Sequence, residues 1–188
     1  MHKRIVLIIA LLFTFVININ AADNDAIKKI RQQFSKWQPI LKDSTVERKI
    51  FYHLFTGENF STEKWTNSYT PSGDIFVGDE LQIIDIDSLG TFVLLMSSSP
   101  SGDWFIHSEN YYWSNGNLFF VFWKMNTYQA SEPSTVERRI YFNESGEEIR
   151  SLESVYKLNT KGKIRNPNFM NREVIYWKTI SELPVSIK

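Results

Sequence analysis

Apolar residues near the amino end recur at helical spacing. They are separated by three, four and three positions, and charged or amide side chains fill the positions between them. The stripe consists of Ile27, Ile30, Phe34 and Trp37. Such a stripe is typical of an amphipathic helix that packs on a core. Acidic and amide residues at 23–25 suit the start of the helix, and Pro39 predicts that it ends or kinks near Gln38.

Between residues 45 and 158 the pattern changes to alternation of period two, which is typical of β-strands. The alternating or wholly apolar runs cover 45–55, 80–87, 91–96, 104–113, 118–127, 134–142 and 149–158. Stretches rich in glycine, asparagine and serine separate them and predict turns. Short connections favour antiparallel pairing of neighbours. The pairing between Tyr52 and Gly90 stays open at this point.

The strongest local signal is a hairpin formed by residues 104–127. Asn115-Gly116 between two β-rich runs is typical of a two-residue type I′ turn. In that register the predicted cross-strand pairs are Trp113 with Leu118, Tyr112 with Phe119, Tyr111 with Phe120, Glu109 with Phe122, and His107 with Lys124.

A second apolar stripe closes the chain. It predicts a helix over residues 168–183 that ends before Pro184. Its members are Phe169, Tyr176, Ile180 and Leu183. The predicted fold class is therefore α+β: a mostly antiparallel β-meander sheet with N-terminal and C-terminal helices packed on one face.

One strand pattern occurs twice. The sequence STVERKIFY at 44–52 returns as STVERRIYF at 134–142, and a glycine turn follows each copy. Internal duplication would make two related halves. Convergence of two amphipathic strands is the alternative, and we favour it because the halves align poorly outside the strand and its turn.

The first 22 residues have the composition of a secretory signal peptide. Lys3 and Arg4 precede an apolar run over 5–17, and Ala21-Ala22 follows. The run is shorter than the roughly 20 residues of a membrane-spanning helix. We expect cleavage after Ala21 or Ala22, a single domain over 23–188, and a location in the periplasm or outside the cell. An uncleaved anchor is the alternative.

Composition narrows the class of partner. The chain has no cysteine, its net charge is zero, and residues 23–188 hold 19 basic against 21 acidic side chains. No basic field would attract nucleic acid, and no stable membrane insertion is expected after cleavage. Aromatic residues make up 15% of the chain, which favours a β-rich core, an aromatic binding surface, or both.

Three segments resemble a group of uncharacterised exported proteins of Gram-negative bacteria. They are the helix with Ile30-Arg31-Gln32-Gln33-Phe34, the aromatic hairpin over 109–122, and the second hairpin over 137–150. The resemblance covers the helix and about 101–150. It implies an N-terminal helix with aromatic-rich hairpins, and it brings no known activity.

The sequence offers little catalytic or metal-binding chemistry. His53 and His107 lack the spacing of zinc ligands, and no nucleotide-binding motif occurs. The run that begins at Asp85 resembles a calcium loop but has Leu89 and Met96 where oxygen ligands belong. We predict no cofactor, no metal and no catalytic set.

The candidate binding residues lie on the aromatic hairpin: Tyr111, Trp113, His107, Glu109 and Lys124. His107 and Glu109 share one strand face with Lys124 opposite, and Tyr111 and Trp113 are the aromatics expected to make exposed contacts. The leading hypothesis is a non-enzymatic exported protein that binds another envelope or secreted protein, or a glycan, through this face. A hydrolase using Glu109 or Asp85 and an inhibitor of a secreted enzyme are the alternatives.

Overall fold

The computed structural model describes residues 23–56, 62–69, 75–164, 167–169 and 171–187. The signal peptide predicted over residues 1–22 lies outside them. A helix over residues 23–42 precedes a single eight-stranded sheet. The strands are β1 Lys49–Thr56, β2 Thr62–Thr66, β3 Ile75–Ile86, β4 Gly90–Ser98, β5 Trp104–Tyr112, β6 Leu118–Thr127, β7 Ser134–Phe142 and β8 Glu148–Lys157.

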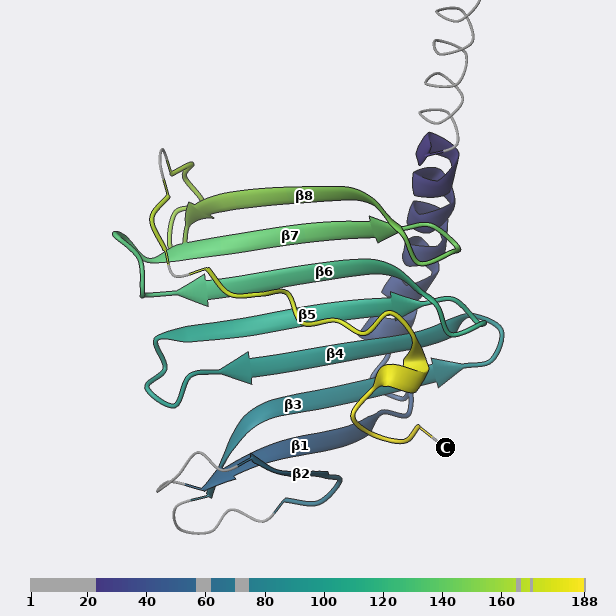
Figure 1. Ribbon diagram of the computed structural model, residues 1–188, viewed down its shortest axis with the longest axis horizontal. Helices are drawn as coiled ribbons and strands as arrows, with labels where there is room; N and C mark the ends of the chain where they lie inside the picture. The colour runs from purple at the N-terminus through teal and green to yellow at the C-terminus, as the bar shows by residue number, and fades with distance from the viewer. Residues whose placement is uncertain (1–22, 57–61, 70–74, 165–166, 170, 188) are drawn as a thin grey trace, which may run out of the picture.

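The sheet is antiparallel throughout, with the order β2-β1-β3-β4-β5-β6-β7-β8 (Figure 1). Strands β3 to β8 form a meander, as the short connections predicted. The pairing left open between Tyr52 and Gly90 is now defined. Strand β1 lies between β2 and β3, so that Tyr52 faces Thr66 on one side and Glu80 on the other. The α+β class and the antiparallel meander are confirmed.

The hairpin between β5 and β6 has the predicted register in its body and a different turn. Tyr111 pairs with Phe120 and His107 with Lys124, but Tyr112 pairs with Leu118 across a bulge. Gly116 has φ +85°, whereas Asn115 is not among the residues with positive φ. The type I′ turn is therefore wrong, since it needs positive φ at both positions. The geometry is a turn followed by a one-glycine bulge.

The second hairpin, between β7 and β8, repeats this turn. Gly146 has φ +79° and its N–H donates to the Asn143 carbonyl at 3.0 Å. In the first hairpin the Gly116 N–H donates to the Trp113 carbonyl at 2.9 Å. Both hairpins thus use one glycine in the left-handed region, the conformation that glycine adopts without a steric penalty.

The helix packs on one face of the sheet. Its inward residues Ile27, Ile30 and Trp37 are buried against a cluster that includes Phe92 and Tyr111. The stripe prediction is confirmed, but the helix continues past Pro39 to residue 42. Pro39 lacks the N–H of a helical hydrogen bond but is on the exposed side, and the following residues Ile40 and Leu41 pack on the same cluster.

The C-terminal helix predicted over residues 168–183 is wrong. Its described residues, 168–169 and 171–183, form an extended strap with one 3-10 turn, Ile180–Glu182, and the strap crosses the face opposite the helix (Figure 1). Val174 and Tyr176 pack inward while Glu173 and Ile175 are exposed, which is a period of two. β-Branched and aromatic residues dominate this stretch and favour extended backbone. The helix and the strap therefore cover opposite faces, not one.

The two copies of the repeated strand present opposite faces. In the second copy Ile140 lies on the strap side of β7. The equivalent Ile50 in β1 pairs with Gln82, which in turn pairs with Leu94 on the helix side. The first copy is also only partly strand, since β1 begins at Lys49. The opposite orientation supports convergence rather than duplication.

Candidate ligand-binding cleft

The helix covers only one end of its face of the sheet. It lies over the turn end, where the Gln33 side chain donates to the Leu89 carbonyl at 2.8 Å and Lys29 pairs with Glu144. Phe34 makes edge contacts with Tyr111 and Phe120, with ring centroids 5.1 and 5.2 Å apart. Further along the strands, away from the turns, side chains of the same face are only half-buried.

A cleft of about 550 Å³ opens where the helix meets this uncovered part. Its apolar lining comes from both layers: Ile30, Phe34 and Leu41 from the helix, and Phe120, Phe122 and Tyr141 from the sheet. Its polar lining consists of Arg31, Gln38, Lys42, Glu109 and Arg139. We call this the cleft. An aromatic floor with polar groups at the rim is the usual make-up of a small-molecule site.

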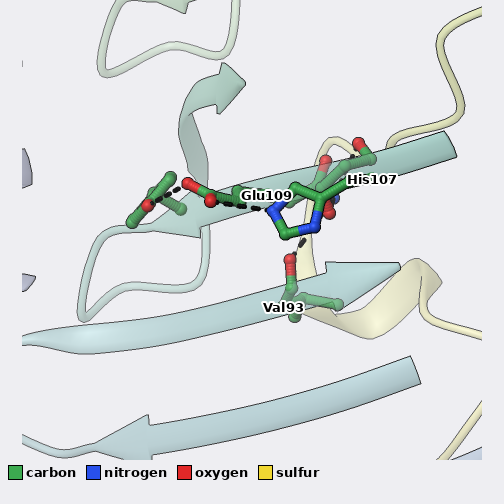
Figure 2. A network of polar contacts seen from close by, with 6 residues as sticks. Val93, His107 and Glu109 are labelled. Carbon is green, nitrogen blue, oxygen red and sulfur yellow. Dashed lines mark hydrogen bonds and ion pairs between the residues drawn. The ribbon is translucent and has the colours of Figure 1, made fainter. Parts of the chain in front are cut away.

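A polar triplet on β5 borders the cleft. The Glu109 carboxylate contacts His107 Nε2 at 2.9 Å and accepts a hydrogen bond from the Tyr111 hydroxyl at 2.5 Å (Figure 2). Burial of Tyr111, together with the adjacent Glu109, raises the pKa of its phenol well above the usual value. The phenol therefore stays a donor, and both carboxylate oxygens of Glu109 are engaged inside the protein.

A second hollow of about 270 Å³ adjoins the cleft, because Phe122 lines both. Its other lining residues are Phe105, His107, Lys124, Asn126 and Glu137. Glu137 contacts Arg139 at 3.1 Å and accepts a hydrogen bond from the Tyr156 hydroxyl at 2.5 Å. Within the described part of the chain, the Lys124 ammonium has no ion-pair or hydrogen-bond partner. We call the lining of this hollow the open face.

The structure brings together three of the five predicted binding residues. His107, Glu109 and Lys124 line the cleft or the open face, although Glu109 pairs with His107 and Tyr111 rather than with Lys124. Tyr111 is fully buried beneath the helix, so the prediction of an exposed contact there is wrong. Trp113 is half-buried at the turn end beneath Lys29, whose ammonium lies 5.3 Å from the indole centroid.

Sequence reasoning missed the basic lining of the cleft. Arg31 and Lys42 come from the helix and Arg139 from β7. The signal was present in part, since Arg31, Gln38 and Lys42 recur at spacings of seven and four beside the apolar stripe. What the sequence could not provide is the contact between the helix and the sheet that turns this flank into a wall of the cleft.

The two carboxylates considered for hydrolysis lie on different faces. Asp85 is two residues after Ile83 on β3, so both side chains are on the side of the sheet that the strap covers, and Asp85 accepts a hydrogen bond from Thr91 Oγ1 at 2.7 Å. Glu109 borders the cleft on the helix side. Among the described residues no three His, Asp or Glu side chains are grouped as metal ligands. In the same residues no helix has the length and apolar character needed to cross a membrane.

A scan against protein-family models, a search of curated proteins and a search of solved structures find no match to this chain.

The buried tyrosines predict a loss of stability at alkaline pH. Burial raises the pKa of Tyr112, and the nearby Glu182 raises it further. The Tyr112 hydroxyl donates a hydrogen bond to the Trp177 carbonyl at 3.0 Å. Because the unfolded phenol ionises near pH 10 and the folded one does not, the unfolded state releases protons first. Each buried tyrosine makes its full contribution to the free energy of unfolding below about pH 10. Above that pH the free energy of unfolding falls by about 1.4 kcal/mol per pH unit for each such tyrosine.

Urea unfolding at pH 9 and pH 11 measures this. Tyr112→Phe should lose less stability between the two pH values than the unmodified protein does, whereas the exposed Tyr128→Phe should lose as much. Equal losses in all three proteins would show that Tyr112 ionises freely in the folded state.

Proposed function

We propose that the protein is an exported, non-enzymatic binding protein that holds its ligand in the cleft and on the adjoining open face. The observation that supports this is the cleft itself: a cavity of about 550 Å³ with an aromatic floor and a charged rim. Its size falls within the roughly 300–1,000 Å³ of small-molecule sites. The cavity is lined by residues of all three segments on which the resemblance to exported proteins rests: the helix, the aromatic hairpin and the second hairpin.

The alternatives gain less support. A hydrolase needs an acid and a base at one reacting centre, and Asp85 and Glu109 are on opposite faces of the sheet. No specific feature of the described residues supports the hypothesis that the protein inhibits a secreted enzyme. A glycan or a partner protein on the open face would use the same aromatic side chains, and the experiment below separates these ligands by mass.

Photo-crosslinking in the native host tests the proposal. A benzophenone amino acid at position 124 reports on the open face, and the same amino acid at position 28, on the exposed outer side of the helix, is the matched control. We expect an adduct of defined mass at position 124 and none at position 28. Equal labelling at both positions, or no adduct at 124, would contradict a binding role for this face.

The same preparation tests export. The intact mass should correspond to residues 23–188, recovered from the periplasm or the medium. A protein that keeps Met1 and fractionates with the membrane would support an uncleaved anchor instead.

A further inference from the structure

We infer that the ligand of the cleft is an anionic amphiphile: one apolar chain or ring system that carries a carboxylate or phosphate head group. This inference rests on the proposed function and adds the chemical class of the ligand. It comes from two properties of the lining, the apolar surface contributed by both layers and the sign of the charge around it.

The apolar part of the ligand is defined by the floor of the cleft. Phe120 is buried and Phe122 is half-buried, and Phe34 closes the floor from the helix. Phe122 also lines the open face, so the apolar surface continues from one hollow into the next. An alkyl chain or a flat ring in this position would cover aromatic surface that water now contacts, which is the main source of affinity for apolar groups.

The charge of the head group is defined by the rim. Three of the charged residues that line the cleft are basic and one, Glu109, is acidic. Both oxygens of Glu109 are already engaged by His107 and Tyr111, whereas Arg31 and Lys42 have no ion-pair partner among the described residues. The excess is local, because the whole chain has no net charge. A low-dielectric groove with basic walls concentrates anions and repels cations.

Arg139 and Arg31 are the head-group contacts. Arg31 and Lys42 are eleven residues apart on the helix, which corresponds to a rise of about 16 Å between their Cα atoms, so their side chains line the cleft from different turns of the helix. Arg139 lies on β7, the same strand as the lining residue Tyr141, and its guanidinium lies 5.5 Å from the Phe122 ring centroid. One of its nitrogens contacts Glu137, and the planar fork can present others to a carboxylate or phosphate.

Four probes with one chain length separate the head-group classes: dodecanoate, dodecyl phosphate, dodecan-1-ol and dodecyltrimethylammonium, all below their micellar concentrations. Binding to the protein as isolated from cells is measured by calorimetry and mapped by backbone amide NMR shifts. We expect both anions to bind about tenfold more tightly than the alcohol, as one charge-assisted hydrogen bond predicts. The cation should bind weakest. The shifts should centre on cleft residues such as Phe122 and Tyr141.

Variants test the named contacts. Arg139→Gln and Arg31→Gln should each weaken dodecanoate binding by about three- to tenfold and leave dodecan-1-ol binding unchanged. Arg139→Lys should recover part of the loss, because the charge is kept and the planar fork is not. Lys28→Gln removes the same charge from the outer side of the helix and should change nothing.

The outcomes separate this inference from the proposed function. Equal affinity for anion, alcohol and cation, with shifts in the cleft, would overturn the anionic head group while leaving the cleft as a binding site. Shifts outside the cleft, or none with any probe, would overturn the amphiphile. A preference for dodecyl phosphate over dodecanoate supports the inference and points to a phospholipid-type head group rather than a free fatty acid.

Discussion

Replacing Trp37 with alanine should cost about 3–5 kcal/mol in the free energy of unfolding, the range for deleting a fully buried aromatic side chain. Trp37 is completely buried and joins the helix to the sheet, with its ring centroid 6.1 Å from Phe92 and 6.4 Å from Tyr111. Trp37 is the largest buried side chain of the described helix, since the other two, Ile27 and Ile30, are smaller. The cavity left behind could close only if the helix and the sheet moved together, because Trp37 packs between them.

Two controls make this prediction specific. Trp37→Phe should cost much less, because no hydrogen-bond partner of the indole Nε1 is found among the described residues and only ring volume is lost. Lys36→Ala, on the exposed side, should change the urea midpoint little. If Trp37→Ala costs under about 1 kcal/mol, well below the range for such truncations, the helix is not a fixed wall of the cleft.

The N-terminal helix and the body of the central hairpin were predictable because both depend on local periodicity. A stripe at spacings of three and four defines which helix face is buried, and alternation defines which strand residues share a face. The same alternation placed His107, Glu109 and Lys124 on one face correctly. These features need no knowledge of what packs against them.

The turn and the strap were mispredicted because two local solutions compete. Asn-Gly suits a type I′ turn, but it also suits a turn in which glycine alone takes positive φ, and the second hairpin has Ser145 before its glycine. For the strap, apolar residues at Tyr176, Ile180 and Leu183 fit a helix, whereas Val174 and Tyr176 fit a strand. The apolar face of the sheet beneath the strap is buried by this segment, and an extended backbone spans more of that face per residue than a helix does.

The basic rim of the cleft was beyond local reasoning for a different reason. Arg31 and Arg139 are more than one hundred residues apart, and each looks like an ordinary solvated side chain on its own element. Arg31 and Arg139 line the same cavity because the helix packs over one end of the sheet. A site made by two layers is a property of packing, which periodicity within either layer does not contain.

Gly90→Ala should also be among the most damaging single changes. Gly90 has φ +110°, and a Cβ there would lie 2.1 Å from the Tyr112 carbonyl oxygen and 2.8 Å from the Trp113 carbonyl carbon. Both are backbone atoms, so no side-chain rotation relieves the contact, and β4 would have to move away from β5. Backbone strain alone costs about 1–3 kcal/mol, and opening the ladder adds to it.

Gly102→Ala is the matched control, because Gly102 also has positive φ, +75°, and a Cβ there would meet nothing within 4 Å. It carries the conformational penalty without the clash, so its loss in urea unfolding should be about 1–2 kcal/mol and clearly smaller than that of Gly90→Ala. Equal losses would mean that φ alone matters and that β4 and β5 are not in close backbone contact at this point. A larger loss at Gly90 would explain why the Asp85–Gly90 run, which resembles a calcium loop, ends in glycine: the neighbouring strand leaves room for no side chain.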